Sequence, residues 1–383
     1  MIYLVVAGAL ALFALFYLVN RKNKEAGPKD EEEEEKEKKE EEGKTVKPVR
    51  KSSKTKPTKL KPSKPAAKEF IDSYKNFQSG VIDFDIKEHY FSVCCEDSLI
   101  RIYKINSITD TKAKYVQGTL QKNQPTAIAL ASNGNTVYVA GGQDLQIHPF
   151  KVEHSGAKFT LEAEKPFIKK HSIRISSLAY TPNCLVSCGE EQDTMIYIWS
   201  HSGDILTSFE NKQLKHKFLV MSKDCRVFSI ATWLGSARVF EFIKAKKTEN
   251  YNGIHVVLEL GGHSQGLSSL GFTSDGLMAV TCGLDLQVRL WNINVQFEFK
   301  EHPVLLKSIK LDNTQSAPSY CALNSKRLVL AIDNSIYVYS VPNLELVTEI
   351  REAHQHSINK IELVENTLVT CSKDTRLMLW QID

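Results

Sequence analysis

The sequence lacks the local patterns that mark nucleotide, metal or nucleophilic chemistry. No glycine-rich phosphate loop ending in lysine occurs, and Gly261–Gly262 precedes a histidine instead. His354 and His356 flank one glutamine, but no cysteine or carboxylate stands beside them at a ligand spacing. Cys94 and Cys95 are adjacent on a predicted strand, so their side chains point to opposite faces and neither is an activated nucleophile. We therefore expect no enzyme activity: no catalytic residues, no metal, no cofactor and no small-molecule substrate.

Glycosylation acceptors and a loop framework of cysteines are also missing. No asparagine begins an N-x-Ser/Thr acceptor. Cys188, Cys282 and Cys371 fall inside apolar runs, at the same place in three repeating units. A cysteine in such a run behaves as a small buried hydrophobe and not as half of a loop disulfide. Both absences favour a reducing compartment for this part of the chain.

Charge is divided unevenly along the chain. Residues 1–68 contain 17 Lys and Arg against 11 Asp and Glu, whereas the remaining residues contain 32 against 34. The net charge of +4 therefore comes from the N-terminal region, and residues 69–383 are close to neutral.

The N-terminal segment is apolar. Residues 2–19, IYLVVAGALALFALFYLV, contain no charge, and a helix of this length is about 27 Å long, enough to cross a thin bilayer. A cleaved signal peptide is the alternative, but no Lys or Arg precedes the run and large residues occupy its end. Because Arg21, Lys22 and Lys24 follow, the positive-inside rule places the later residues in the cytosol. We expect residues 1–19 to be an uncleaved anchor with a luminal N-terminus.

Residues 20–68 are predicted to be a disordered linker, here named the tether. Glu31–Glu42 is acidic and has no apolar face, and the stretch after it combines ten Lys or Arg with four Pro and no acid. That stretch is either a solvated spacer or a contact for anionic lipid head groups or RNA phosphates. No aromatic residue interleaves its cations, which argues against base stacking. The ten cations are Lys44, Lys47, Arg50, Lys51, Lys54, Lys56, Lys59, Lys61, Lys64 and Lys68.

From about residue 70 the chain repeats. Leu277–Trp291 predicts two short strands joined by a tight turn at Gly283–Asp285, and the same layout returns elsewhere. An aromatic residue ends the third predicted strand of each unit at intervals of 41 to 51 residues, at Tyr103, Phe150, Trp199, Phe240, Trp291, Tyr339 and Trp380. This period is that of a four-stranded propeller blade. Because a closed ring removes exposed sheet edges, we expect residues 69–383 to form an all-β, seven-bladed propeller.

Three of the units resemble the WD40 family residue by residue. Each has an upstream histidine, a Ser or Thr in its second strand, an aspartate in the following turn and a tryptophan six residues later. These residues are His171, Ser187, Asp193 and Trp199; His263, Thr281, Asp285 and Trp291; and His354, Thr370, Asp374 and Trp380. The resemblance implies that each set forms a hydrogen-bonded chain inside its blade. Recurrence at equivalent places favours a structural role over acid–base chemistry.

The other four units depart from this pattern, and none has a clear upstream histidine. We expect these blades to depend on apolar packing. We also expect the outer strand missing from the last unit to come from around Phe70–Phe77. Three of the four units keep the aspartate but replace the tryptophan, and one has neither: Tyr103 with Asp97, Phe150 with Asp144, Tyr339 with Asp333, and Phe240 alone.

Within the WD40 family, the order of anchor, charged tether and propeller is similar to that of an endoplasmic-reticulum-anchored member. His171–Phe209 and Gly261–Gly276 carry this resemblance best. It implies a non-enzymatic scaffold on the cytosolic face of that membrane, which associates with the stress-sensing kinase PERK and contacts the ribosome or mRNA in stress-selective translation. The alternative is a nucleotide exchange factor for a small GTPase in vesicle budding, although the anchor of those propellers lies at the C-terminal end.

The tether can be tested by removing its charge. If its basic part, Lys44–Lys68, binds RNA or anionic membrane, replacing the ten Lys and Arg of that part by Gln flattens the fall of affinity with salt, because each neutralised phosphate releases counterions. Titrations at several salt concentrations measure this slope, and the melting temperature serves as the folding control. A salt slope equal to that of the unsubstituted chain contradicts binding by the tether.

Overall fold

The computed structural model describes residues 69–155, 158–213, 215–244, 251–297, 301–311 and 316–382. The predicted anchor and the tether, with the ten predicted contact cations of Lys44–Lys68, lie outside these residues. Over the ranges that it does describe, no helix is long and apolar enough to cross a membrane.

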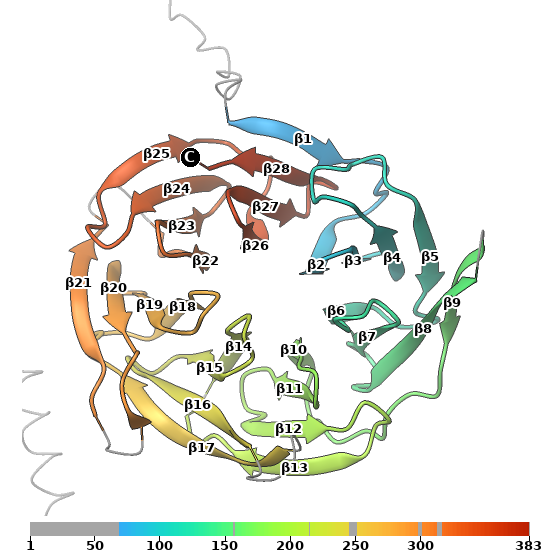
Figure 1. Ribbon diagram of the computed structural model, residues 1–383, viewed down its shortest axis with the longest axis horizontal. Helices are drawn as coiled ribbons and strands as arrows, with labels where there is room; N and C mark the ends of the chain where they lie inside the picture. The colour runs from blue at the N-terminus through green and yellow to red at the C-terminus, as the bar shows by residue number, and fades with distance from the viewer. Residues whose placement is uncertain are drawn as a thin grey trace, which may run out of the picture. The chain divides into compact units, whose positions relative to one another are not determined.

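Seven four-stranded antiparallel sheets are arranged as blades around a central axis, which confirms the predicted seven-bladed propeller (Figure 1). In six blades the four strands follow one another in sequence, from the axis outward. The seventh blade takes its outer strand, β1, from the beginning of the described chain. Blades are numbered in chain order, so that blade 1 begins with β2 and blade 7 with β26.

The strands occupy four radial positions. The innermost are β2 (Val81–Lys87), β6 (Pro125–Leu130), β10 (Ile175–Tyr180), β14 (His216–Met221), β18 (Leu267–Phe272), β22 (Tyr320–Leu323) and β26 (Ile358–Val364). The second are β3 (Tyr90–Cys95), β7 (Thr136–Gly141), β11 (Leu185–Gly189), β15 (Val227–Thr232), β19 (Met278–Gly283), β23 (Arg327–Ile332) and β27 (Thr367–Ser372). The third are β4 (Leu99–Lys104), β8 (Ile147–Ser155), β12 (Met195–Trp199), β16 (Ala237–Lys244), β20 (Gln287–Asn292), β24 (Ser335–Ser340) and β28 (Leu377–Gln381). The outermost are β5 (Tyr115–Thr119), β9 (Lys158–Ala163), β13 (Ile205–Glu210), β17 (Tyr251–Leu260), β21 (Val304–Lys310), β25 (Leu346–Ile350) and β1 (Phe70–Tyr74).

The core lies between the faces of neighbouring blades. Every residue of β6, β15 and β18 is buried, because both faces of these inner strands are covered. The outer strands β5 and β13 instead alternate between exposed and half-buried positions, as strands with one covered face do. One apolar cluster joins Tyr138 of blade 2 to Leu185 and Trp199 of blade 3, so burial holds each blade to the next.

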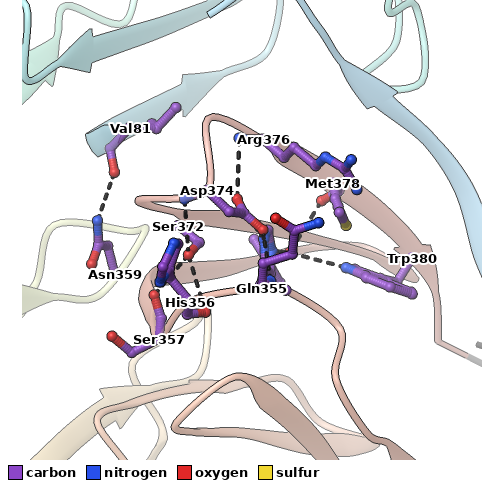
Figure 2. A network of polar contacts seen from close by, with 12 residues as sticks. Val81, Gln355, His356, Ser357, Asn359, Ser372, Asp374, Arg376, Met378 and Trp380 are labelled. Carbon is purple, nitrogen blue, oxygen red and sulfur yellow. Dashed lines mark hydrogen bonds and ion pairs between the residues drawn. The ribbon is translucent and has the colours of Figure 1, made fainter. Parts of the chain in front are cut away.

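Six of the seven innermost strands contain a β-bulge after their first paired residue. In four blades the extra residue is small and polar, and its side chain donates a hydrogen bond to a backbone carbonyl. Two of these bonds cross between blades: Thr126 Oγ1 donates to the Ile175 carbonyl at 2.6 Å, and Asn359 Nδ2 donates to the Val81 carbonyl at 2.7 Å (Figure 2). The six bulge residues are Ile82, Thr126, Ser176, Lys217, Ser268 and Asn359.

Strand β1 closes the ring by pairing with β28, the role predicted from the sequence for the segment near residue 70. Its last residue, Tyr74, is 1% exposed and packs against blade 1, with ring centroids 5.1 Å from Phe91 and 5.0 Å from Tyr103. The Tyr74 hydroxyl donates a hydrogen bond to the Ile108 carbonyl at 3.0 Å. Tyr74 therefore joins the outer strand of blade 7 to the core of blade 1.

This closure predicts a large cost for removing the Tyr74 side chain. We expect Tyr74→Ala to lower the free energy of unfolding by about 3–5 kcal/mol, because a buried aromatic ring is lost and a cavity remains. Tyr74→Phe removes only the hydrogen bond and should cost about 1 kcal/mol. Urea denaturation measures both. Equal midpoints for the two variants would show that the ring does not depend on this contact.

Candidate functional site

The four predicted residues of blade 5 form one continuous hydrogen-bonded chain. His263 Nδ1 lies 3.1 Å from Asp285 Oδ1, and His263 Nε2 lies 2.9 Å from Thr281 Oγ1. Trp291 Nε1 donates to the same hydroxyl at 3.0 Å. The proton pattern follows: Nδ1 donates to the carboxylate, the Thr281 hydroxyl donates to Nε2, and it accepts from the indole.

Blades 3 and 7 repeat this geometry. The histidine Nδ1 to carboxylate distance is 2.9 Å in both, and the histidine Nε2 to hydroxyl distance is 2.8 Å in blade 3 and 2.7 Å in blade 7. The indole donates at 2.8 Å and 3.0 Å, respectively. Figure 2 shows Asp374 and Trp380 in the blade 7 network, beside the bonds of Ser372 to the loop carbonyls. The structure thus brings together His171, Ser187, Asp193 and Trp199 in blade 3 and His354, Thr370, Asp374 and Trp380 in blade 7.

Each aspartate also ties two loops together. Asp285 accepts from the backbone of Ser264, after the histidine, at 2.9 Å, and from the backbone of Gln287, in its own turn, at 3.1 Å. Burial alone raises the pKa of Asp285, but the bonds from His263 and these amides outweigh it and hold the pKa below its usual range. The site leaves no space at Gly283, where a Cβ would lie 2.2 Å from Asp285 Oδ1 and 2.4 Å from His263 Nδ1.

The networks serve blade structure and not catalysis. The side chains of His263 and Asp285 are 0% and 5% exposed, and those of His354 and Asp374 are fully buried. Within each His–Ser/Thr–Asp–Trp network, every side-chain donor meets an acceptor in the same blade. No group of the network is therefore free to contact a substrate. Among the residues with described positions, no group of three or more His, Cys, Asp or Glu could hold a metal ion.

Blade 2 contains a polar pair that the sequence analysis missed. His148 Nε2 lies 2.7 Å from Asp144 Oδ2, so the aspartate keeps a histidine partner. This histidine comes from β8, two residues before Phe150, and not from the loop before the blade. Blade 2 has the expected apolar packing, with Phe150 in a buried cluster, and this polar pair is added to it. A histidine four residues after the turn aspartate was the available signal, since both side chains reach the same end of the strand.

Blade 1 has the expected apolar packing around Tyr103 and, in addition, a stacked arginine near the position of the missing histidine. Phe77 stands four residues before the inner strand, where the intact blades have histidine. The Arg101 guanidinium carbon lies 4.8 Å from the Phe77 ring centroid and 5.1 Å from that of Tyr115. Arg101 Nη2 also donates to the Asn76 carbonyl at 2.8 Å. In blade 1 the Arg101 guanidinium, through its contacts with two rings and a loop carbonyl, thus connects the strands and the loop that the network connects in the intact blades.

Blades 4 and 6 keep the expected apolar packing at their aromatic positions. Phe240 stacks on Phe228 with centroids 5.1 Å apart and meets Phe209 at 5.2 Å. Tyr339 is buried in a cluster with Leu328 and other apolar side chains.

A cavity of about 710 Å³ follows the propeller axis and is lined by all seven innermost strands. Its walls carry charge, mostly in pairs. Lys360 Nζ donates to Asp83 Oδ1 at 2.7 Å, and this bond joins blade 7 to blade 1. The other pairs are Lys87 with Asp85 at 3.4 Å, Lys223 with Glu362 at 3.1 Å and Lys373 with Glu96 at 3.5 Å. The channel is thus an accessible concave surface whose walls offer polar contacts.

The intact and substituted blades should respond differently to loss of their turn aspartate. Asp285→Ala leaves His263 and two amides without an acceptor, at about 1–3 kcal/mol for each orphaned group. Asp97 is exposed and accepts only from Leu99 N at 3.3 Å, so Asp97→Ala should cost well under 1 kcal/mol. Thermal melting compares the two variants, and equal shifts in melting temperature contradict this assignment of roles.

Comparison with known proteins agrees with the geometry. The WD40 family, described as "WD domain, G-beta repeat", matches residues 255–292, which contain the complete blade 5 network. Transducin beta-like protein 2 of Homo sapiens is 25% identical over 265 residues, which are 68% of this chain and 59% of the relative. The Mus musculus protein of the same name is 23% identical over 254 residues, covering 66% and 57%. The chain thus spans less than two thirds of the length of these relatives. The seven-bladed ring, its three His–Ser/Thr–Asp–Trp networks and the match in blade 5 make the chain a seven-bladed β-propeller that is similar to the WD40-repeat family.

Proposed function

We propose that this chain is a non-enzymatic scaffold whose propeller binds protein partners. The observation that carries the proposal is the axial channel, a rigid concave surface to which all seven inner strands contribute. Its charged walls are accessible, whereas the His–Asp pairs that resemble catalytic groups are buried inside the blades. Charged groups on such a surface give specificity for a partner of complementary charge.

The scaffold acts at the cytosolic face of the endoplasmic reticulum membrane in this proposal. Residues 2–19 supply the anchor, and the cations that follow place the propeller in the cytosol. The strand cysteines support a reducing compartment, because Cys188, Cys282 and Cys371 are free and fully buried. The similarity of domain order supports the kinase PERK and the ribosome or mRNA as partners, and the cations of Lys44–Lys68 support contact with RNA phosphates or anionic lipid. No contact of the described residues favours the exchange-factor alternative.

Protease protection in sealed microsomes tests the topology on which every partner depends. We expect protease added outside to digest the tether and to release a compact propeller fragment. Proximity labelling from the propeller, in stressed and unstressed cells, should then mark PERK. A propeller that resists protease until detergent is added lies in the lumen, and that result would overturn the scaffold function as stated here.

A further inference from the structure

One sector of the propeller carries many cations and no ion pairs. The loops that enter the innermost strands and the turns between the second and third strands emerge on the same face, here named the upper face. Over blades 3 and 4, the described part of this face holds seven Lys and Arg, and none forms an ion pair with another described residue. We name them the basic sector: Lys165, Lys169, Lys170, Arg174, Lys212, Lys215 and Lys217.

Large apolar side chains are exposed within the same sector. Ile168 is 56% exposed, Trp233 is 51% exposed and Leu234 is 45% exposed. Ile168 lies in the loop before blade 3, and the other two lie in the turn between β15 and β16 of blade 4. Exposed apolar residues beside uncompensated charge are typical of an interaction site.

The rest of the channel wall shows that this lack of pairing is local. Four lysines line the channel on blades 1, 4 and 7, and each has a carboxylate within 3.5 Å: Lys87, Lys223, Lys360 and Lys373. Arg174 and Lys217 also line it, and neither has such a partner among the described residues. Glu190 stands on the same wall but lies within ion-pair distance of neither.

Lys217 occupies a position that other blades use for structure. It is the bulge residue of β14, equivalent to Thr126, Ser176, Ser268 and Asn359, whose side chains bond backbone carbonyls. Lys217 makes no such bond, and its ammonium lies 5.4 Å from the centre of the Trp233 ring. Burial lowers the pKa of Lys217, because the ammonium loses part of its hydration and no nearby carboxylate stabilises its charge. An unpaired cation at a structural position is therefore available to an anionic ligand.

We propose that the basic sector binds an acidic peptide segment of a protein partner. Carboxylates of the peptide reach Arg174 and Lys217 at the mouth of the channel, and an apolar side chain packs against Leu234. The outer lysines attract the segment through their field and set its orientation. This inference rests on the proposed scaffold function and specifies the partner's chemistry.

The geometry favours a peptide over the other two polyanions. A membrane surface is flat and meets the outer lysines, but it does not reach cations on the channel wall. Single-stranded nucleic acid requires open aromatic faces, and the one exposed aromatic ring of this sector already has Lys215 and Lys217 ammoniums 4.8 Å and 5.4 Å from its centre. Glu164, Glu190 and Glu191 lie among these cations. Their carboxylates would repel a continuous run of phosphates, whereas a peptide of mixed composition can place neutral or basic residues beside them.

A peptide titration tests the proposal in the full chain. The tether lysines and arginines are first replaced by Gln, so that their charge does not contribute. The probe is a fluorescein-labelled twelve-residue peptide of glutamates with two central leucines, and its glutamine counterpart is the neutral control. We expect the acidic peptide to bind with salt-dependent affinity and to alter the emission of Trp233, since Trp199, Trp291 and Trp380 are buried.

Matched charge reversals decide the site. Arg174→Glu with Lys217→Glu should weaken peptide binding at least tenfold. Lys307→Glu with Lys310→Glu makes the same charge change on the exposed outer strand β21 and should leave affinity within about twofold. If the first variant fails to fold, Arg174→Gln with Lys217→Gln replaces it, with a loss of at least about threefold expected.

Equal affinities for the two charge-reversed variants overturn the proposal. So does a loss that appears with a twelve-nucleotide oligouridylate or with phosphatidylserine vesicles and not with the peptide. Binding by the purified chain does not depend on its membrane topology. A luminal propeller would therefore overturn the scaffold function without changing this result, and the two failures can be told apart.

Discussion

The structure depends on the closure of its ring between β1 and β28. Each blade buries both faces of its inner strands only because a neighbour stands on either side, and an open ring would expose two apolar sheet faces. The seam between blades 7 and 1 is accordingly joined by three contacts, at two depths. Lys360 bonds Asp83 and Asn359 bonds the Val81 carbonyl beside the channel, while Tyr74 packs into blade 1 from the outer strand.

Polar networks inside the blades meet a second requirement. They hold the loop before each blade against the turn between its second and third strands. In blades 3, 5 and 7 a histidine, a hydroxyl, an aspartate and a tryptophan satisfy one another in full. Blades 1 and 2 use other polar contacts in place of this network. In blade 1 the Arg101 guanidinium lies between two rings, and in blade 2 His148 lies beside Asp144. The strand or loop that supplies the polar contact therefore differs between blades.

The distribution of charge along the channel connects this framework to function. Where a lysine joins blades it is paired, as Lys360 is with Asp83, and the burial that lowers its pKa is outweighed by nearby carboxylates that raise it. Where cations stand unpaired, over blades 3 and 4, they contribute nothing to holding the ring together and repel one another. The same channel wall therefore contains paired lysines that join blades and two cations, Arg174 and Lys217, without an ion pair among the described residues.

The sequence by itself determined the number of blades, the three complete networks and the segment that closes the ring, because these follow from spacings within one repeat or from a count of repeats. His263 and Trp291 lie in one unit, and their partners stand at fixed distances along the chain. Only the tertiary structure decided which charges are paired. Lys360 and Asp83 are 277 residues apart and meet because the ring closes, and Arg174 and Lys217 approach one channel mouth because blades 3 and 4 are neighbours. Whether a lysine has a partner depends on strands from other blades, and no local pattern contains that information.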